Sequence, residues 1–285
     1  MQSVARAGLV SSSASTLPPF ALLRPTQLDE AVAALRQADR PVLLAGGTDL
    51  VAAFNEGLMP GTLIDLSRID ALRRIELADE GLRIGATVTH AAGCEHALLA
   101  RHAPGLAAAW RRIANPRVRL SGTLGGNLMA RRLRYEGSVL LSAIGASLDF
   151  AGLAGHSRSA PAALWAAPPE QGLLQAIVVP LAGLQWFGYE RSMRPLITLA
   201  SALRLGADGL ILRCAVATEY LAPVVLERAL PTRHLADVSG LARGEAAALM
   251  AGLPDDFNDP VVNARYARSA GAALLARQLE GAHRG

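Results

Sequence analysis

The 285-residue chain is 51% hydrophobic and has a formal net charge of +4, which is typical of a folded protein with a sizeable core. All 28 basic residues are arginine and are interspersed with the 24 acidic residues, so there is no basic stripe with interleaved aromatic residues of the kind that binds nucleic acid. The two cysteines, which lack a Cys-x-x-Cys spacing, exclude a disulfide framework and a zinc or iron–sulfur site on this chain.

Residues 1–18 are rich in serine and alanine and end at Pro18 and Pro19, so we expect a flexible tail there and the folded part from about Phe20. Serines at 11–13 interrupt the early apolar stretch, unlike the continuous apolar region of a signal peptide. No run approaches the roughly 18 apolar residues of a membrane span. The expected localisation is therefore cytoplasmic.

The chain after the tail has the pattern of helix, strand, turn and helix. Thr26–Asp29 predicts a capping-box start, followed by apolar residues at helical spacing up to Ala38. The short apolar run 42–45 predicts a strand that ends at Gly46-Gly47, and the residues after it predict a new helix. The same patterns predict strands at 62–66, 82–88, 147–150 and 176–179, helices at 90–100, 104–114 and 138–146, and a loop with a short helix up to about 172.

The best domain boundary is at 180–183, where Pro180 and Gly183 interrupt the pattern. Beyond it, strands are predicted at 197–205 and 209–217, followed by helices at 245–252 and 261–280. This part of the chain reads as a separate α+β unit.

Two glycine turns are the most informative features, at 45–49 (Ala-Gly-Gly-Thr-Asp) and 123–127 (Thr-Leu-Gly-Gly-Asn). A diphosphate needs close approach by backbone N–H groups, which residues without a Cβ allow. Thr48 and Asp49 are candidates to cap the following helix. In isolation, each turn is more often only a tight turn. Neither matches the dinucleotide fingerprint G-x-G-x-x-G or the phosphate loop G-x-x-x-x-G-K-[ST], which disfavours both of those folds.

The strings LLAGGTDLVAAF, IDLSRIDALRRIE, LRIGATVTHA and NPRVRLSGTLGGNL, followed by GLLQAIVVP and GYERSMRP, occur in this order between about residues 20 and 280. Together they resemble the flavoprotein subunit of molybdenum hydroxylases, the family of the xanthine dehydrogenase and aerobic carbon monoxide dehydrogenase FAD-binding subunits. The resemblance implies an α+β fold: a two-subdomain FAD-binding fold of the vanillyl-alcohol oxidase type at 19–181, with subdomains of about 19–75 and 76–181, and a C-terminal α+β domain at 182–285.

By this resemblance the cofactor is FAD, with both glycine turns at its diphosphate. The implied cofactor-binding residues are Ala45, Gly46, Gly47, Thr48, Asp49, Thr123, Leu124, Gly125, Gly126, Asn127, Glu136 and Arg191. Glu136 matches a flavin-contacting acid of the family by spacing only, and Arg191 stands where relatives have a cation near the flavin, although an ordinary surface arginine is the alternative. No catalytic residue and no metal ligand is predicted, because the flavin itself would accept and release electrons.

Three further sets of residues leave alternatives open. Where many relatives have an acidic segment after the second glycine turn, this chain has Arg131, Arg132 and Arg134, which could contact flavin, an electron acceptor or a partner, or form a solvated basic turn. Tyr189 could stack near the flavin or be a half-buried strand aromatic. His90 and Cys94 lie four residues apart, as metal ligands can on a helix, but without a third ligand we interpret them as structural.

The resemblance implies an FAD-carrying electron-transfer subunit, which passes electrons from a [2Fe–2S] small subunit to an external acceptor. A molybdopterin-binding large subunit would oxidise the substrate, so the molybdenum cofactor and the [2Fe–2S] clusters are expected on partner chains. One alternative is a stand-alone flavin dehydrogenase or oxidase. Another is a degenerate family member without FAD that acts as a binding or assembly protein.

Overall fold

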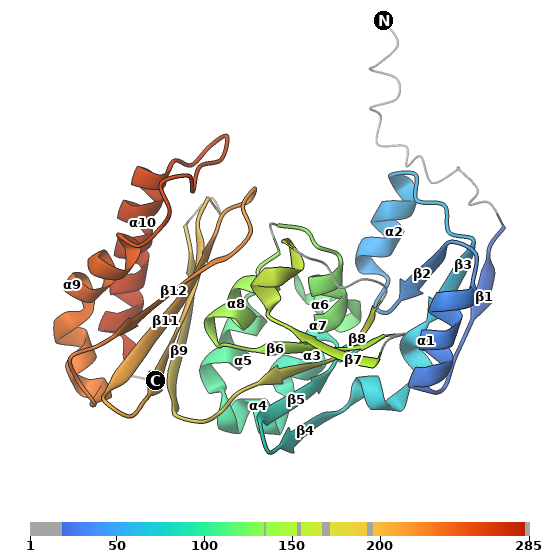
Figure 1. Ribbon diagram of the computed structural model, residues 1–285, viewed down its shortest axis with the longest axis horizontal. Helices are drawn as coiled ribbons and strands as arrows, with labels where there is room; N and C mark the ends of the chain where they lie inside the picture. Colours follow the sequence, from blue (N-terminus) through green and yellow to red (C-terminus); the bar gives the residue numbers. More distant parts are fainter. Residues whose placement is uncertain (1–18, 134, 153–154, 167–171, 193–195, 283–285) are drawn as a thin grey trace, which may run out of the picture.

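The computed structural model describes residues 19–282 except 134, 153–154, 167–171 and 193–195. The predicted flexible tail, 1–18, lies outside the described residues. The described chain forms three β-sheets, of three, five and four strands. Figure 1 shows these sheets in a row along the longest axis, in chain order, each with helices packed against it.

The first sheet has three parallel strands in the order β1-β3-β2. The strands are β1 (Ala21–Leu23), β2 (Pro41–Leu44) and β3 (Thr62–Asp65), joined by helices α1 (Leu28–Gln37) and α2 (Thr48–Asn55) and followed by the 3-10 turns η2 (Leu66–Arg68) and η3 (Asp70–Arg73). Helical crossovers connect the strands because parallel strands cannot be joined by a hairpin. The predicted capping box is shifted by one residue: Gln27 is the N-cap, and the carboxylate of Glu30 accepts hydrogen bonds from the N–H groups of Thr26 and Gln27 at 2.9 and 3.2 Å.

The middle sheet is antiparallel, with the strand order β4-β5-β8-β6-β7. Its strands are β4 (Ile75–Ala78), β5 (Gly81–Gly85), β6 (Ser147–Gly152), β7 (Gly155–Ser159) and β8 (Gly172–Val179). The associated helices are α3 (His90–Glu95), α4 (Ala97–His102), α5 (Pro104–Arg111), α6 (Pro116–Ser121), α7 (Leu124–Met129), α8 (Gly137–Ala143) and the 3-10 turn η4 (Pro161–Leu164). Trp110 and Phe150 are fully buried in the core between the sheet and these helices.

Two segments of this middle part differ from the sequence prediction. The single helix predicted at 90–100 is two helices, because His96 has an extended backbone and its Nδ1 accepts a hydrogen bond from the N–H of Leu98, which caps α4. The predicted loop before 172 contains β7, whose residues are mostly exposed. An exposed polar strand has no apolar alternation by which to recognise it.

The last sheet is also antiparallel, with the order β12-β11-β10-β9. Its strands are β9 (Leu184–Arg191), β10 (Thr198–Leu205), β11 (Leu210–Ala217) and β12 (Val224–Ala229), followed by the 3-10 turn η5 (Leu235–Asp237) and helices α9 (Val238–Met250) and α10 (Ala264–Glu280). Figure 1 shows α9 and α10 on the outer face of this sheet and α8 on its inner face, which is turned toward the middle sheet. Ala200, Ala202 and Ala215 on the inner face belong to the same core as Trp110.

Arg204 on β10 connects the last sheet to the middle part of the chain. Its guanidinium donates hydrogen bonds to the carbonyl oxygens of Ile144, Pro180 and Ala182, at 2.6, 2.7 and 2.8 Å. The carbonyl of Ile144 lies at the end of α8, where helix carbonyls lack intrahelical partners. This side chain therefore ties β10 to the end of α8 and to the segment between β8 and β9.

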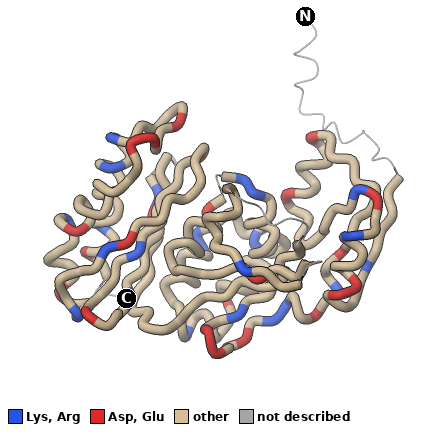
Figure 2. The backbone as a smooth tube through the Cα atoms, viewed as in Figure 1, with Lys and Arg blue, Asp and Glu red and all other residues tan. Residues whose placement is uncertain are grey.

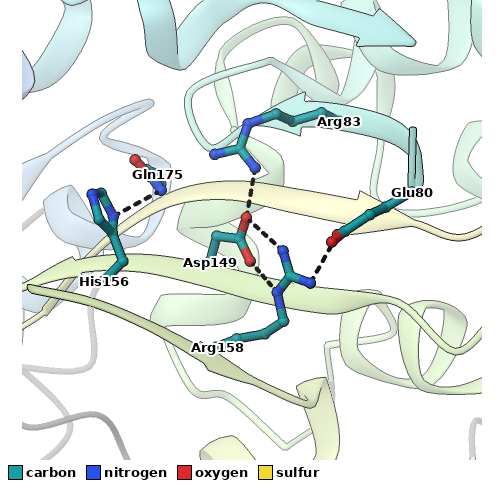
Figure 3. Close-up of polar contacts among 6 residues, drawn as sticks. All are labelled: Glu80, Arg83, Asp149, His156, Arg158 and Gln175. Atoms are coloured by element: carbon teal, nitrogen blue, oxygen red, sulfur yellow. Dashed lines mark hydrogen bonds and ion pairs between the residues drawn. The ribbon is translucent and has the colours of Figure 1, made fainter. Parts of the chain in front are cut away.

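The middle sheet carries an ion-pair network centred on Asp149 (Figure 3). The carboxylate of Asp149 accepts hydrogen bonds from Arg83 at 2.5 Å and from Arg158 at 2.7 Å, and Arg158 also contacts Glu80 at 2.8 Å. Asp149 and Arg158 are directly opposite in the pairing of β6 and β7, while Arg83 reaches them from β5. The network therefore links three strands across the sheet.

Arginine and acidic residues are interspersed over all three parts of the molecule in Figure 2, as the sequence suggested. Among the helices of the described residues, none combines the length and the apolar character that crossing a bilayer requires.

Candidate cofactor site

A cavity of about 850 Å³ lies between the first sheet and the middle part of the chain. All predicted cofactor-binding residues except Leu124 line it: Ala45, Gly46, Gly47, Thr48, Asp49, Thr123, Gly125, Gly126, Asn127, Glu136 and Arg191. Leu124 is buried in the core of the middle part instead. The structure thus brings residues from both glycine motifs, the α7–α8 connection and β9 to one cavity.

The first glycine motif is a tight turn between β2 and α2. Gly47 is the N-cap of α2, in the left-handed conformation at φ +71°, which favours glycine. Thr48 and Asp49 are therefore the first residues of the helix, and the prediction that they cap it is wrong. The N–H groups of residues 46–50 donate no hydrogen bond to any described part of the chain; Val51, which donates to the carbonyl of Gly47 at 2.9 Å, is the first to do so.

The second glycine motif is not the predicted turn but the start of a short helix. Thr123 is the N-cap of α7, and its Oγ1 accepts a hydrogen bond from the N–H of Gly126 at 3.0 Å. The N–H groups of Leu124 and Gly125 donate to the carbonyls of Val88 and Ala86, both at 2.9 Å. These amides are therefore already paired within the chain, in contrast to those of the first motif.

Glycine at 125 is required by packing. A Cβ at this position would lie 2.5 Å from the carbonyl oxygen of Ala86, closer than real contacts allow. Asn127, two residues later and also in the cavity lining, has a buried side-chain oxygen without a hydrogen-bond partner among the described residues. Because an unpaired buried acceptor is costly, this oxygen suits a ligand that donates a hydrogen bond.

Glu136 and Arg191 meet in an ion pair of 2.8 Å. The hydroxyl of Tyr189 also donates to Glu136, at 3.3 Å, and burial, followed by the charge of Glu136, raises the pKa of Tyr189 above its usual value. Arg112 lies over the ring of Tyr189, 5.2 Å from its centre, and donates to the backbone carbonyl of Tyr189 at 3.0 Å. Tyr189 is thus a buried strand aromatic behind the cavity wall, and Arg191 does not present an isolated positive charge.

The arginine-rich segment contributes through Arg132. Its guanidinium binds the carboxylates of Asp49 at 3.3 Å and Glu56 at 3.1 Å, so the side chain of Asp49 is engaged by protein groups. Arg131 is exposed and has a φ of +50°. Arg134 lies outside the described residues.

His90 is a cavity residue that the sequence analysis treated as structural. Its side chain is 2% exposed, its Nδ1 has no partner among the described residues, and burial, followed by the charge of Arg119, lowers its pKa to about 4. Its backbone N–H donates to the carbonyl of Gly122 at 2.9 Å, which places it beside the second motif. The sequence signal for this role was its position two residues after the end of the predicted strand at 82–88, in the string ATVTH. Within the described residues, no group of three His, Cys, Asp or Glu side chains is arranged to hold a metal ion.

These features define a class of protein: an α+β fold with a large cavity for a small-molecule cofactor between two glycine-containing motifs. The chain belongs to the family described as FAD binding domain in molybdopterin dehydrogenase, whose model matches residues 18–182. The resemblance found in the sequence is confirmed, and FAD is the cofactor of this family.

Curated relatives support the assignment. The chain is 31% identical over 141 residues to the nicotine 6-hydroxylase medium subunit of Paenarthrobacter nicotinovorans, a match that covers 49% of this chain and 50% of that one. It is 36% identical over 107 residues to the xanthine dehydrogenase FAD-binding subunit of Escherichia coli O157:H7, covering 37% of each. These matches thus span about half, or less, of the length of the curated relatives.

Solved structures share the fold over nearly the whole chain. Quinoline 2-oxidoreductase from Pseudomonas putida 86 gives a TM-score of 0.77 at 22% identity, covering 95% of this chain and 99% of that one. Carbon monoxide dehydrogenase from Hydrogenophaga pseudoflava gives 0.75 at 25% identity, covering 94% and 99%. The predicted fold class is confirmed: an α+β FAD-binding fold followed by a further α+β part.

The residues present fit FAD by their own chemistry. The first motif offers consecutive unpaired N–H groups at the start of an eight-residue helix, which suit a diphosphate. The unpaired atoms of Asn127 and His90 suit hydroxyl or ring groups of the same cofactor. A cavity of about 850 Å³ falls in the size range of cofactor sites, about 300–1,000 Å³.

Proposed function

We propose that the chain is the FAD-carrying electron-transfer subunit of a multi-subunit molybdenum hydroxylase. In this proposal it receives electrons from a [2Fe–2S] small subunit and passes them to an external acceptor, while a molybdopterin-binding large subunit oxidises the substrate. The observation that carries the proposal is the single cavity that joins the open amides of the first glycine motif to the Glu136–Arg191 pair. The names of the relatives, which describe medium and FAD-binding subunits, support the partners.

The proposed roles follow from which groups are free. The N–H groups of residues 46–50 would bind the diphosphate, and Gly46, Gly47, Gly125 and Gly126 would allow its close approach. Thr123 and Asn127 would add side-chain contacts, and Leu124 would contribute only packing. Bound FAD supplies the redox chemistry. The protein residues orient it, and no general acid or base is assigned.

The extent of the family match supports the predicted division into an FAD-binding domain at 19–181, with subdomains at about 19–75 and 76–181, and a C-terminal domain at 182–285. We propose this division together with the function. The cytoplasmic localisation remains a prediction.

The first test is the visible absorption spectrum of the purified chain before and after incubation with FAD. We expect a bound-flavin spectrum in the wild type and its loss in Gly126→Asp, because a Cβ at 126 would lie 2.7 Å from Thr123 Oγ1 and the new carboxylate would face the cofactor diphosphate. Gly244→Asp, at an exposed position of α9 with open space around it, is the matched control and should retain the flavin. A folded, colourless wild type that ignores FAD would contradict the flavoprotein assignment and favour the degenerate alternative.

The subunit role needs its own test. Affinity purification of the tagged chain from its native host should recover two further chains, with molybdenum and iron detected by elemental analysis. Reduction of the FAD-loaded isolated chain by a small organic substrate, without any other chain present, would instead support a stand-alone flavin dehydrogenase and contradict the electron-relay role.

A further inference from the structure

Arg132 spans two carboxylates on one face of α2. Asp49 is in the first turn of this helix and Glu56 is its C-cap residue, and since they lie seven residues apart, about two turns, both point to the same side. The Nε of Arg132 is 3.3 Å from Asp49 and one terminal nitrogen is 3.1 Å from Glu56. The hydroxyl of Tyr135 adds a hydrogen bond to Asp49 at 2.9 Å. Arg132 and Tyr135 come from the α7–α8 connection, far from α2 in the sequence.

Apart from these contacts, α2 is held by little packing. None of its residues is fully buried, and Val51 is 60% exposed. Yet Thr48, Asp49, Leu50 and Ala53 line the cofactor cavity, and Tyr135 lines it from the other side. The polar contacts of Arg132 and Tyr135 therefore join the two sides of the cavity, where few apolar contacts do so.

We propose that Arg132, supported by Tyr135, is a positioning residue that latches α2 over the cofactor cavity and so slows the release of FAD. The statement about FAD rests on the proposed function, whereas the ordering of α2 does not. The latch also explains how a carboxylate can stand beside a diphosphate site. Asp49 next to the open amides of residues 46–50 would repel an anionic ligand, and the charge of Arg132 offsets this repulsion.

The ordering of α2 can be measured without any cofactor. Hydrogen exchange of the amides at 51–56 should accelerate in Arg132→Gln by about threefold to tenfold, the range expected when two partly exposed ion pairs are removed from a thinly packed helix. Exchange in β10 and β11 should not change, which separates loss of the latch from global unfolding. Arg117→Gln, which removes an exposed arginine on α6, is the matched control and should leave α2 unchanged.

The release of FAD is followed by flavin fluorescence after dilution of the loaded chain into an excess of apo-protein. We expect Arg132→Gln to release FAD about threefold to tenfold faster than wild type, and Glu56→Gln, which leaves the cavity lining intact, to change release in the same direction by less. Glu56→Gln also serves as the test if Arg132→Gln does not fold. Exchange and release rates equal to those of Arg117→Gln in both variants would overturn the proposal. If the wild type binds no FAD while the exchange result holds, only the proposed function fails.

Discussion

Gly46 lies directly against the backbone carbonyl of Ser121, and a Cβ at position 46 would overlap that oxygen. The contact joins the turn after β2 to the end of α6, immediately before the second glycine motif. A Cβ at Gly122 would in turn lie 3.3 Å from Thr48 Oγ1. The first motif therefore touches the residues that lead directly into the second, and this close approach brings both motifs to one cavity.

Gly46→Ala should lower both stability and FAD affinity. The added methyl group would clash with backbone atoms of Ser121 rather than with a movable side chain, so the turn after β2 must move away from the end of α6. This movement should lower the free energy of unfolding by about 2–3 kcal/mol. We expect a lower midpoint in urea unfolding and at least about tenfold weaker FAD binding, equivalent to 1.4 kcal/mol. Gly244→Ala, on an exposed face of α9 with open space, should be neutral or stabilising by up to about 1 kcal/mol. Equal effects of the two substitutions would show that the Gly46 contact is not tight.

The Glu136–Arg191 pair should set the local charge next to the cofactor. In Glu136→Gln the guanidinium of Arg191 loses its partner, so a positive charge would favour the reduced, more negative flavin and raise the reduction potential. In Arg191→Gln the carboxylate of Glu136 loses its positive partner, and the reduction potential should fall. We expect shifts on the order of 20–30 mV in opposite directions, equivalent to roughly 1 kcal/mol for a two-electron couple, measured by dye equilibration of the FAD-loaded chain. Shifts of the same sign would show that the pair does not act through its charge.

The sequence predicted the cavity-lining motifs because their signals are local. A short apolar run ending in Gly46-Gly47 indicates a strand and a turn, and the structure has β2, the turn and α2 there. Both motifs together were also specific enough for the family to be named. Strands β10 and β11 were predicted for the same reason, since a nearly continuous apolar pattern marks buried strands.

The features that the sequence did not predict depend on contacts between residues that are distant in the chain. The second motif was expected to be a turn because two glycines disfavour a helix, but hydrogen bonds from Leu124 and Gly125 to the backbone at 86–88 fix the chain at the start of α7. The partners of Arg132 could not be predicted, because nothing in the sequence places it beside Glu56. Strand β12, at a sheet edge, was missed because half of its residues are exposed.

The ionisation of Asp149 should make the free energy of unfolding depend on pH in the acid range. Burial alone would raise its pKa, but hydrogen bonds and charges from Arg158 and Arg83 outweigh this effect and lower it. A carboxylate with a lowered folded-state pKa stabilises the fold above its unfolded pKa of about 4, and this contribution is lost as pH falls through the folded value. Asp149→Asn should therefore cost about 1–3 kcal/mol at pH 7, discounted because Arg158 is half exposed. The difference from wild type should shrink at pH 3.

The measurement is urea unfolding at pH 7 and pH 3, with Asp79→Asn, at an exposed turn position, as the matched control. A difference between wild type and Asp149→Asn that is the same at both pH values would show that the network does not depend on the ionised carboxylate.

His90 should give a second pH dependence, at higher pH. Burial, followed by the charge of Arg119, lowers its pKa to about 4 in the folded chain, whereas an unfolded histidine titrates near 6.5. Between these values the unfolded chain binds a proton that the folded chain does not, so the free energy of unfolding decreases as the pH falls from about 7 to 4, by at most about 2–3 kcal/mol. In His90→Gln this part of the pH dependence should disappear, while the exposed His234→Gln serves as the control. A wild-type stability curve that is flat between pH 7 and 5 would mean that His90 titrates normally in the folded chain and is not buried as a neutral ring.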